Sequence, residues 1–282
     1  MDLLKLSNIA IKAALSAGKI IQQYMNEDVS VEIKKGGTSH ASQVVTEVDR
    51  ACETTILAQL LPTCNEFDLA FLSEETADDG SRFLKDFFWC IDPMDGTLAF
   101  INKRPGFSVS IALVAKDGTP YIGVVFNPST DTLYHAIKGN GAFKNGQPWK
   151  IKPTNDHLTY VTDRKLKDTP RAAEIEMLLK EKVAKLNLSG VKEIAGAGAV
   201  LNGIYVLENG PACMLKFPKK ESGGGSIWDF AATACIYREL GLPATNFEGG
   251  KLDLNRKENT FMNHEGVFYD NISYKENPRE SA

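Results

Sequence analysis

The chain has 282 residues, of which 43% are hydrophobic and 24% are charged, and its formal net charge is −4. This composition is ordinary for a globular protein and leaves room for one large domain or two modest ones. A slightly acidic chain does not suit a broad nucleic-acid or anionic-membrane surface. Residues 1–5 lack the start of a secretory signal, and no apolar run is long enough to cross a bilayer.

Cysteine usage points to a reducing compartment. The count is odd, and no pair has the C-x-x-C spacing. The five residues are Cys52, Cys64, Cys90, Cys213 and Cys235. Most lie in apolar or helical segments, which is typical of reduced thiols that serve as small apolar side chains. We therefore expect a cytoplasmic protein.

The first half of the chain predicts two helices followed by strands. Apolar residues recur at steps of three and four over residues 3–25, which indicates an amphipathic helix. Residues 34–45 are small and polar and are expected to form a mobile loop. A second helix is predicted over residues 46–61, with Thr46 as its N-cap. Strands are then expected at residues 69–72, 87–91, 109–114, 121–126 and 132–137, the third and fourth forming a hairpin.

Beyond residue 150 the pattern changes to alternating helices and strands. Helices are predicted at residues 172–186, 200–207 and 228–240, and strands at 213–215, 244–247 and 267–269. We therefore expect an α+β N-terminal half over residues 1–150 and an α/β C-terminal half over residues 151–282. Both would belong to one compact unit with layers of helices and sheets.

Acidic residues gather at four places where a strand ends or a helix begins. The most informative is residues 89–97, which read Trp-Cys-Ile-Asp-Pro-Met-Asp-Gly-Thr. Asp92 and Asp95 follow an apolar strand there, and Pro93 is expected to end it. The other three clusters are Glu47 with Asp49, Glu74 with Glu75, and Asp229 after Trp228. Each alone is typical of a solvated loop or a helix start, but together they suit hard cations, which prefer oxygen ligands.

Phosphate recognition is indicated by the same segment. Gly96 and Thr97 stand where a helix would begin, and backbone amides at a helix start can bind phosphate. A phosphatase that holds two hard cations about 4 Å apart needs several carboxylates for the cations. It also needs amides or a hydroxyl for the phosphate. The pattern therefore favours metal-assisted phosphate chemistry.

Other catalytic chemistries lack their motifs in this chain. The four histidines are scattered and have no zinc-binding spacing. The segment 106–110 fails the Gly-x-Ser-x-Gly pattern at its last position. Gly18-Lys19 lacks the remaining residues of a phosphate-binding P-loop, and the glycine clusters do not form a dinucleotide fingerprint.

With these motifs in view, the chain resembles the inositol monophosphatase superfamily of lithium-sensitive, magnesium-dependent phosphatases. The resemblance rests on the acidic pair at 74–75, the Asp-Pro-Met-Asp-Gly-Thr motif at 92–97 and the Trp-Asp pair at 228–229, in that order. It implies a layered αβαβα fold and two or three Mg²⁺ ions. The implied metal ligands are Glu74, Asp92, Asp95, Asp229 and the carbonyl of Met94.

The resemblance also implies roles in catalysis. Asp49 would help to bind a third metal ion or its water, and Gly96 and Thr97 would bind phosphate. Thr97 and Glu74 would orient the attacking water, and the loop at residues 34–39 would close over the site. Water activated by the metal would attack phosphorus in line, so that no protein nucleophile is needed.

The substrate is predicted from the segment before Trp228. Inositol monophosphatases carry an acidic residue there, whereas residues 216–225 of this chain read Lys-Phe-Pro-Lys-Lys-Glu-Ser-Gly-Gly-Gly. This basic segment suits a substrate with a second phosphate, and Lys216 is the expected contact. Residues 100–101 and 107–113 also resemble the bacterial-type 3′(2′),5′-bisphosphate nucleotidase branch, which converts adenosine 3′,5′-bisphosphate to AMP. We therefore favour that activity.

Three alternatives stay open, partly because residues 196–199 lack the hydroxyl that relatives often use. They are inositol-1-monophosphatase activity, fructose-1,6-bisphosphatase-like activity, and a catalytically silent relative that binds phosphorylated ligands. The expected partner is a small phosphate ester rather than a nucleic-acid polymer or a membrane. The resemblance also suggests a homodimer.

Overall fold

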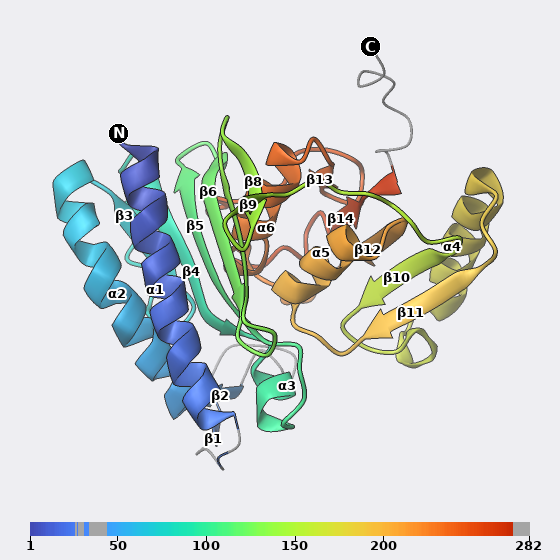
Figure 1. Cartoon of the computed structure of the whole chain (residues 1–282), viewed down its shortest axis with the longest axis horizontal. Coiled ribbons are helices and arrows are strands. Elements are labelled where there is room, and N and C mark those ends of the chain that lie inside the picture. The colour runs from blue at the N-terminus through green and yellow to red at the C-terminus, as the bar shows by residue number, and fades with distance from the viewer. Residues whose placement is uncertain (26, 28–30, 34–43, 273–282) are drawn as a thin grey trace.

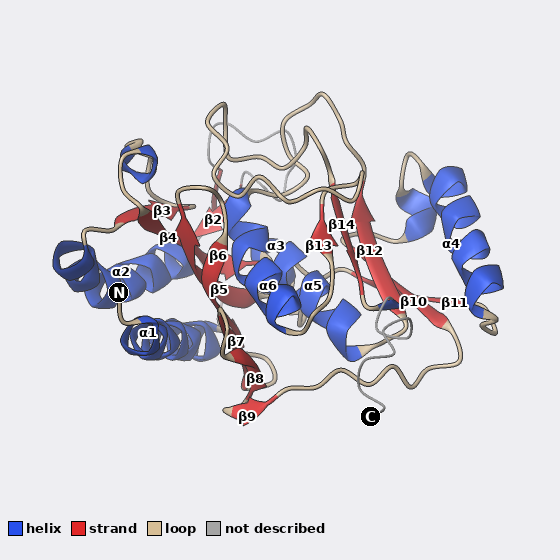
Figure 2. Cartoon of the chain, turned by 90° about the horizontal axis from the view of Figure 1, so that it is seen from above, coloured by secondary structure: helices blue, strands red, loops and turns tan. Residues whose placement is uncertain are grey.

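Five layers of helices and sheets make up the chain, as seen in a computed structural model that describes residues 1–25, 27, 31–33 and 44–272 (Figure 1). Two helices cover one face of a seven-stranded sheet, and two more helices separate that sheet from a five-stranded sheet. A further helix covers the outer face of the second sheet, which Figure 2 shows from above. This order confirms the predicted αβαβα fold.

The first layer consists of α1 (Leu3–Tyr24) and α2 (Glu47–Phe67). Thr46 caps α2 as predicted, and its side chain accepts hydrogen bonds from the first turn. The helix continues through Pro62, beyond the predicted end at residue 61. Leu60 and Thr63 on either side of the proline are buried, so packing against the sheet holds the helix together there.

The seven-stranded sheet has the order β3-β4-β5-β6-β7-β8-β9, with β3 and β4 parallel and the other neighbours antiparallel. Its strands are β3 (Ala70–Ser73), β4 (Phe87–Asp95), β5 (Ser108–Ala115), β6 (Pro120–Asn127), β7 (Thr132–Ile137), β8 (Gly141–Lys144) and β9 (Gln147–Pro148). The predicted hairpin of residues 109–126 is confirmed. The short strands β8 and β9 lie in a glycine-rich region for which the sequence predicts no strand.

The prediction that Pro93 ends its strand is wrong. Strand β4 runs on to Asp95, and its pairing with β5 shifts register between Asp92 and Asp95. Proline has no N–H to donate to a neighbouring strand, so it fits where the hydrogen-bond ladder between two strands is irregular. Directly after this stretch, Gly96 turns the chain into the short helix α3 (Thr97–Ile101).

The five-stranded sheet has the order β11-β10-β12-β14-β13. Its strands are β10 (Leu158–Thr162), β11 (Val191–Ala195), β12 (Ala212–Lys216), β13 (Ala244–Thr245) and β14 (Val267–Asp270). Strand β10 is parallel to both β11 and β12. The sequence did not predict β10 and β11, because β10 is short and rich in threonine and the edge strand β11 is largely exposed.

Three helices pack against this second sheet. They are α4 (Ala172–Leu186) on the outer face, and α5 (Ala199–Glu208) and α6 (Ile227–Glu239) in the layer between the sheets. A continuous apolar cluster joins α5 and α6 to both sheets. The two sheets lie on either side of the predicted boundary near residue 150, and the functional division into two halves stays a prediction.

The remaining regular structure is small. Strands β1 (Val31–Ile33) and β2 (Val44–Thr46) pair antiparallel, and 3₁₀ turns lie at Ser81–Phe83 and Leu166–Asp168. The predicted closing loop at residues 34–39 lies outside the described residues. All five cysteines are free thiols, and four of them are buried. Within the described ranges, no helix has the length and apolar character that a bilayer crossing requires.

Candidate active site

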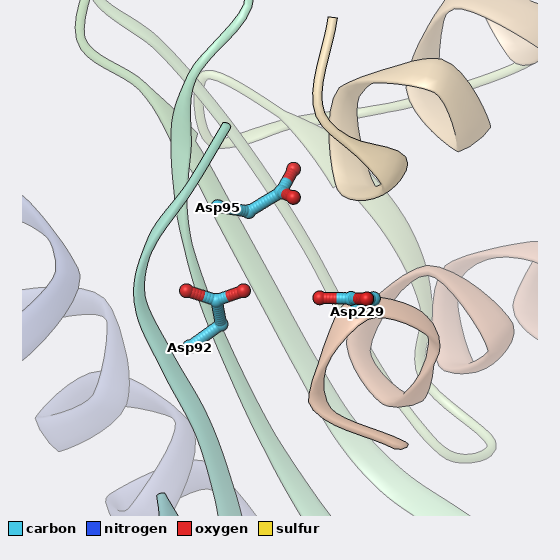
Figure 3. Close-up of side chains that lie close together, drawn as sticks. All are labelled: Asp92, Asp95 and Asp229. Atoms are coloured by element: carbon cyan, nitrogen blue, oxygen red, sulfur yellow. The ribbon is translucent and has the colours of Figure 1, made fainter. Parts of the chain in front are cut away.

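Three aspartates from distant parts of the chain converge between the two sheets. Asp92 and Asp95 project from the end of β4, and Asp229 projects from the first turn of α6 (Figure 3). One carboxylate oxygen from each lies within 4.8 Å of the others. Asp92 is 1% exposed and Asp95 is 8% exposed, so little water screens their charges. The structure thus brings together three of the predicted metal ligands.

Local hydrogen bonds orient Asp92 and Asp229. Oδ1 of Asp92 accepts a hydrogen bond from the Met94 amide at 3.1 Å. Oδ2 of Asp229 accepts one from the Ser226 amide at 2.7 Å, as part of a capping box that begins α6. Gly225 precedes this cap with φ of +88°, and a Cβ there would lie 2.7 Å from Asp229 Oδ2. The glycine run therefore lets the chain approach the carboxylate closely.

Asp95 is held by the start of α5. Its Oδ1 accepts a hydrogen bond from the Ala199 amide at 3.1 Å, and its Oδ2 accepts one from the Val200 amide at 2.9 Å. A carboxylate at a helix N-terminus is stabilised by the unpaired amides and the helix dipole. A Cβ on Gly198 would lie 2.2 Å from Asp95 Oδ2, so only glycine fits beside this contact.

The three carboxylates destabilise one another's charged form. Burial raises the pKa of Asp92 well above its usual value, and the charges of Glu74, Asp95 and Asp229 raise it further. Burial also raises the pKa of Asp95 and of Asp229, although backbone amides offset part of this. A bound cation would neutralise these charges, and an all-oxygen donor set fits a hard divalent ion such as Mg²⁺.

Glu74 lies directly after β3, next to the strand that carries Asp92. Its amide donates a hydrogen bond to the Ile91 carbonyl at 3.2 Å. The charge of Glu74 raises the pKa of both Asp92 and Asp95, although its carboxylate is outside the group of three. The Met94 carbonyl oxygen lies 3.2 Å from Thr97 Oγ1 and is a second acceptor within reach of the one hydroxyl proton of Thr97.

Thr97, two residues beyond Asp95 in the chain, forms a buried hydrogen-bonded pair with Asp49. The Thr97 hydroxyl donates to Asp49 Oδ1 at 3.1 Å. Oδ2 of Asp49 in turn accepts hydrogen bonds from the Thr46 amide at 2.7 Å and the Thr46 hydroxyl at 2.5 Å. Gly96 has φ of +86°, and a Cβ there would lie 2.4 Å from the Gly106 carbonyl oxygen. The tight turn at Gly96 thus sets the first amides of α3 beside the carboxylates.

Lys216 ends β12, and its ammonium forms an ion pair with Asp163 after β10. Burial lowers the pKa of Lys216, but the charges of Asp163, Asp229 and Asp95 and the Asp163 hydrogen bond raise it above its usual value. Asp163 also accepts a hydrogen bond from Asn202 Nδ2 at 2.8 Å. Asp163 and Asn202 were not predicted as site residues, because β10 was not predicted and no motif in residues 199–208 marks Asn202.

A layered α/β fold whose carboxylates converge at the ends of its elements could hold metal ions for phosphate chemistry. The model of the inositol monophosphatase family matches residues 2–277, so the chain belongs to this family of phosphoric monoester hydrolases. The resemblance seen in the sequence is therefore confirmed.

Several relatives extend over most of the chain. Inositol monophosphatase 3 from Solanum lycopersicum is 32% identical over 262 residues, which cover 89% of each chain. Extragenic suppressor protein suhB from Bartonella henselae has a crystal structure with a TM-score of 0.69 and 25% identity, which covers 95% of this chain and 94% of that one.

SaIMPase-II has been solved with inositol monophosphate and with 2′AMP. The inositol monophosphate complex is 26% identical, has a TM-score of 0.65, and covers 94% of this chain and 89% of that one. The 2′AMP complex is 25% identical and has a TM-score of 0.68, and the match covers 96% of this chain and 92% of that one.

Proposed function

We propose that the chain hydrolyses a small phosphate monoester with Mg²⁺ ions held by Asp92, Asp95, Asp229 and Glu74. The observation that carries this proposal is the convergence of the three aspartates within 4.8 Å, where Asp92 and Asp95 are buried, Asp229 is half-buried, and the carboxylates repel one another. Such a cluster is costly unless cations occupy it. Two or three ions, with the Met94 carbonyl as an added ligand, are the number and arrangement that the family resemblance suggests.

The chain's own residues then hold water and phosphate. Bound Mg²⁺ supplies Lewis acidity, which activates water and offsets charge on the phosphoryl oxygens. When the Thr97 hydroxyl donates its hydrogen bond to Asp49, its oxygen is left to accept a hydrogen bond from the attacking water and so to orient it. Thr46 fixes Asp49 through two hydrogen bonds, and Glu74 would orient the water from the β3 side. Asp49 would also bind a third ion or its water.

The phosphate would lie against the turn between β4 and α3. The amides of Gly96 and Thr97 stand at the start of α3, where the first amides lack acceptors within the helix. Placed beside a metal-bound phosphate, they would donate hydrogen bonds to its oxygens and stabilise the added negative charge in the transition state. The left-handed φ of Gly96 makes this arrangement possible.

For the substrate, we place inositol 1-phosphate first. Relatives over most of the chain are inositol monophosphatases, and SaIMPase-II binds inositol monophosphate. Adenosine 3′,5′-bisphosphate, which the sequence favoured, remains the second candidate. It is supported by the position of Lys216 near the carboxylates and by the 2′AMP complex of SaIMPase-II. The homodimer and the cytoplasmic location stay predictions.

A phosphate-release assay tests this function. Purified protein is given inositol 1-phosphate, adenosine 3′,5′-bisphosphate or fructose 1,6-bisphosphate at equal concentration, with Mg²⁺ or with EDTA. We expect release only with Mg²⁺, and fastest from inositol 1-phosphate. Release that persists in EDTA, or in Asp229→Asn, would contradict the metal site. Binding of a substrate without release would identify a catalytically silent relative.

A suitable control for Asp229→Asn is Glu248→Gln. Glu248 is an exposed acid in the turn after β13, away from the carboxylate cluster in the chain. The Glu248→Gln substitution removes the same charge without changing a proposed ligand, and the rate of phosphate release by this variant should equal that of the wild type. Equal loss in both variants would mean that overall charge, rather than metal binding, explains the result.

A further inference from the structure

Arg82 is a buried cation outside the carboxylate cluster. It lies in the 3₁₀ turn Ser81–Phe83, within the connection that leads from β3 past Glu74 to β4. Its side chain is 1% exposed, although arginine is rarely buried unless it is paired. A guanidinium has several N–H donors and no acceptor, so its burial requires acceptors at fixed places around it.

Two distant segments supply acceptors to the Arg82 guanidinium. Its Nε donates to Asp78 Oδ2 at 2.8 Å, within the same connection between β3 and β4. Its Nη1 donates to Asn255 Oδ1 at 2.6 Å, and its Nη2 donates to the Arg256 carbonyl oxygen at 2.8 Å. Because the guanidinium is planar and rigid, these hydrogen bonds fix the two segments relative to each other.

The first of these segments carries Glu74. Glu74 directly follows β3, and Asp78 lies further along the same segment. Between them, the Thr76 hydroxyl donates to Glu53 Oε1 on α2 at 3.1 Å. The segment is thus held by α2 at Thr76 and by Arg82 at Asp78. Removal of the guanidinium takes away the second of these contacts, so the segment that carries Glu74 gains freedom to shift.

The second segment supports Asp229. Beyond Arg256, residues 260–262 pair antiparallel with residues 225–227 through backbone hydrogen bonds of 2.8 and 2.9 Å. The Arg256 guanidinium donates to a carbonyl oxygen within residues 260–262 at 3.3 Å. Ser226 is the N-cap of α6, and its amide donates to Asp229 Oδ2 at 2.7 Å. The place of Asp229 therefore depends on the segment that Arg82 holds.

We propose that Arg82 is a positioning residue of the Mg²⁺ site, which holds the Glu74 side and the Asp229 side at the separation that the ions require. It acts through Asp78 and the Arg256 carbonyl. A contact that only stabilised the fold would not need a buried charge, because apolar side chains of similar volume generally pack at less cost. The inference rests on the proposed phosphatase function and adds a residue to its metal site.

The test measures Mg²⁺ binding to the substrate-free protein by isothermal titration calorimetry. In Arg82→Met, we expect the dissociation constant for Mg²⁺ to rise at least about tenfold, which is the usual effect of removing a group that orients metal ligands. The Mg²⁺ concentration for half-maximal phosphate release should rise with it, while KM for the ester at saturating Mg²⁺ should stay near the wild-type value. Arg82→Lys keeps the charge but not the planar set of donors, so it should recover only part of the affinity.

The matched control is Asn271→Ala. Asn271 is 0% exposed, and its side chain also joins distant backbone groups. It accepts from the Ala212 amide and donates to the Val206 carbonyl, both at 2.7 Å. Ala212 begins β12 and Val206 lies in the last turn of α5, at the ends of these elements that are remote from the carboxylates. This variant should melt at a lower temperature but bind Mg²⁺ as the wild type does.

The outcomes separate this role from the proposed function. If the wild type neither binds Mg²⁺ nor releases phosphate, the proposed function fails. If the wild type does both and Arg82→Met lowers only the melting temperature, as the control does, the positioning role is overturned while the phosphatase function stands. Full recovery of affinity in Arg82→Lys would also overturn it, because the charge alone would then suffice.

A second variant keeps the test decisive if Arg82→Met does not fold. Asp78→Asn retains the shape of the side chain but weakens its bond to the guanidinium, since a neutral acceptor replaces a charged one. The dissociation constant for Mg²⁺ should rise in this variant by a smaller factor than in Arg82→Met. An unchanged constant in Asp78→Asn would contradict the proposal.

Discussion

The carboxylate of Asp95 accepts a hydrogen bond from the amide of Val200 at 2.9 Å, although the two residues are 105 positions apart. This bond joins the end of β4 in the seven-stranded sheet to the start of α5 in the layer between the sheets. It fixes one proposed metal ligand by a backbone group rather than by a side chain. The orientation of Asp95 therefore depends on where α5 begins, and on Gly198, which permits the close approach.

The substitution Gly198→Ala tests this dependence. The φ of Gly198 is −64°, so alanine meets no backbone strain there, but its Cβ would lie 2.2 Å from Asp95 Oδ2. We expect kcat to fall by about 100-fold, since a displacement of about 1 Å at a catalytic group has effects of this size. The measurement is Mg²⁺-dependent phosphate release, with melting temperature as a check of folding.

The matched control is Gly250→Ala. A Cβ at Gly250 would meet only the Asn246 side chain, at 3.0 Å or more, and this side chain hydrogen-bonds Glu265 and the Gly250 amide rather than a proposed metal ligand. Its activity should stay within about twofold of the wild type. If both glycine variants lose activity equally, the contact between Asp95 and α5 is not the cause.

Asp92→Asn should separate activity from stability. Removing one charge from the proposed metal site should lower kcat/KM by at least about 100-fold. In EDTA the same variant should melt at a higher temperature than the wild type, because it relieves the repulsion that raises the pKa of Asp92. Each kcal/mol of relief corresponds to about 2–4 °C for a protein near this size. A melting temperature below the wild type in EDTA would show that Asp92 serves mainly to hold the fold.

The pH dependence of the metal-free protein follows from the same shifts. The pKa values of Asp92 and Asp95 are raised in the folded chain above the usual value of about 4. The folded state therefore binds more protons than the unfolded state above pH 4, and its stability must fall as pH rises through the folded pKa values. We expect the melting temperature in EDTA to be higher at pH 5 than at pH 7.5.

Adding Mg²⁺ should remove most of this dependence, since cations that bind only the folded state stabilise it by mass action. The comparison is a set of melting curves at both pH values with EDTA and with excess Mg²⁺. Asp92→Asn in EDTA should show a weaker pH dependence than the wild type. A wild-type melting temperature that rises from pH 5 to 7.5 in EDTA would contradict the mutual repulsion of the aspartates.

The sequence predicted the metal-binding side of the site better than the substrate side, and the reason is physical. Asp92 and Asp95 lie three residues apart on one strand, and the Trp-Asp pair opens a helix, so local patterns marked them. Asp163, the ion-pair partner of Lys216, is 53 residues away in the chain. It follows β10, which has no clear alternation of apolar and polar residues. Contacts of this kind depend on how β10, β12 and α5 pack together, which short sequence patterns do not encode.

The pair formed by Thr97 and Asp49 yields the last prediction. If the Thr97 hydroxyl orients water by donating to Asp49, then the hydroxyl and not the methyl group is required. Thr97→Val keeps the shape of the side chain but removes the donor, and we expect kcat to fall by about 100-fold or more. Thr97→Ser restores the hydroxyl and should recover activity to within about tenfold of the wild type, with KM similar in both variants. Equal activity in the valine and serine variants would mean that Thr97 serves only in packing. Asp49 would then have to act on the attacking water without the Thr97 hydroxyl.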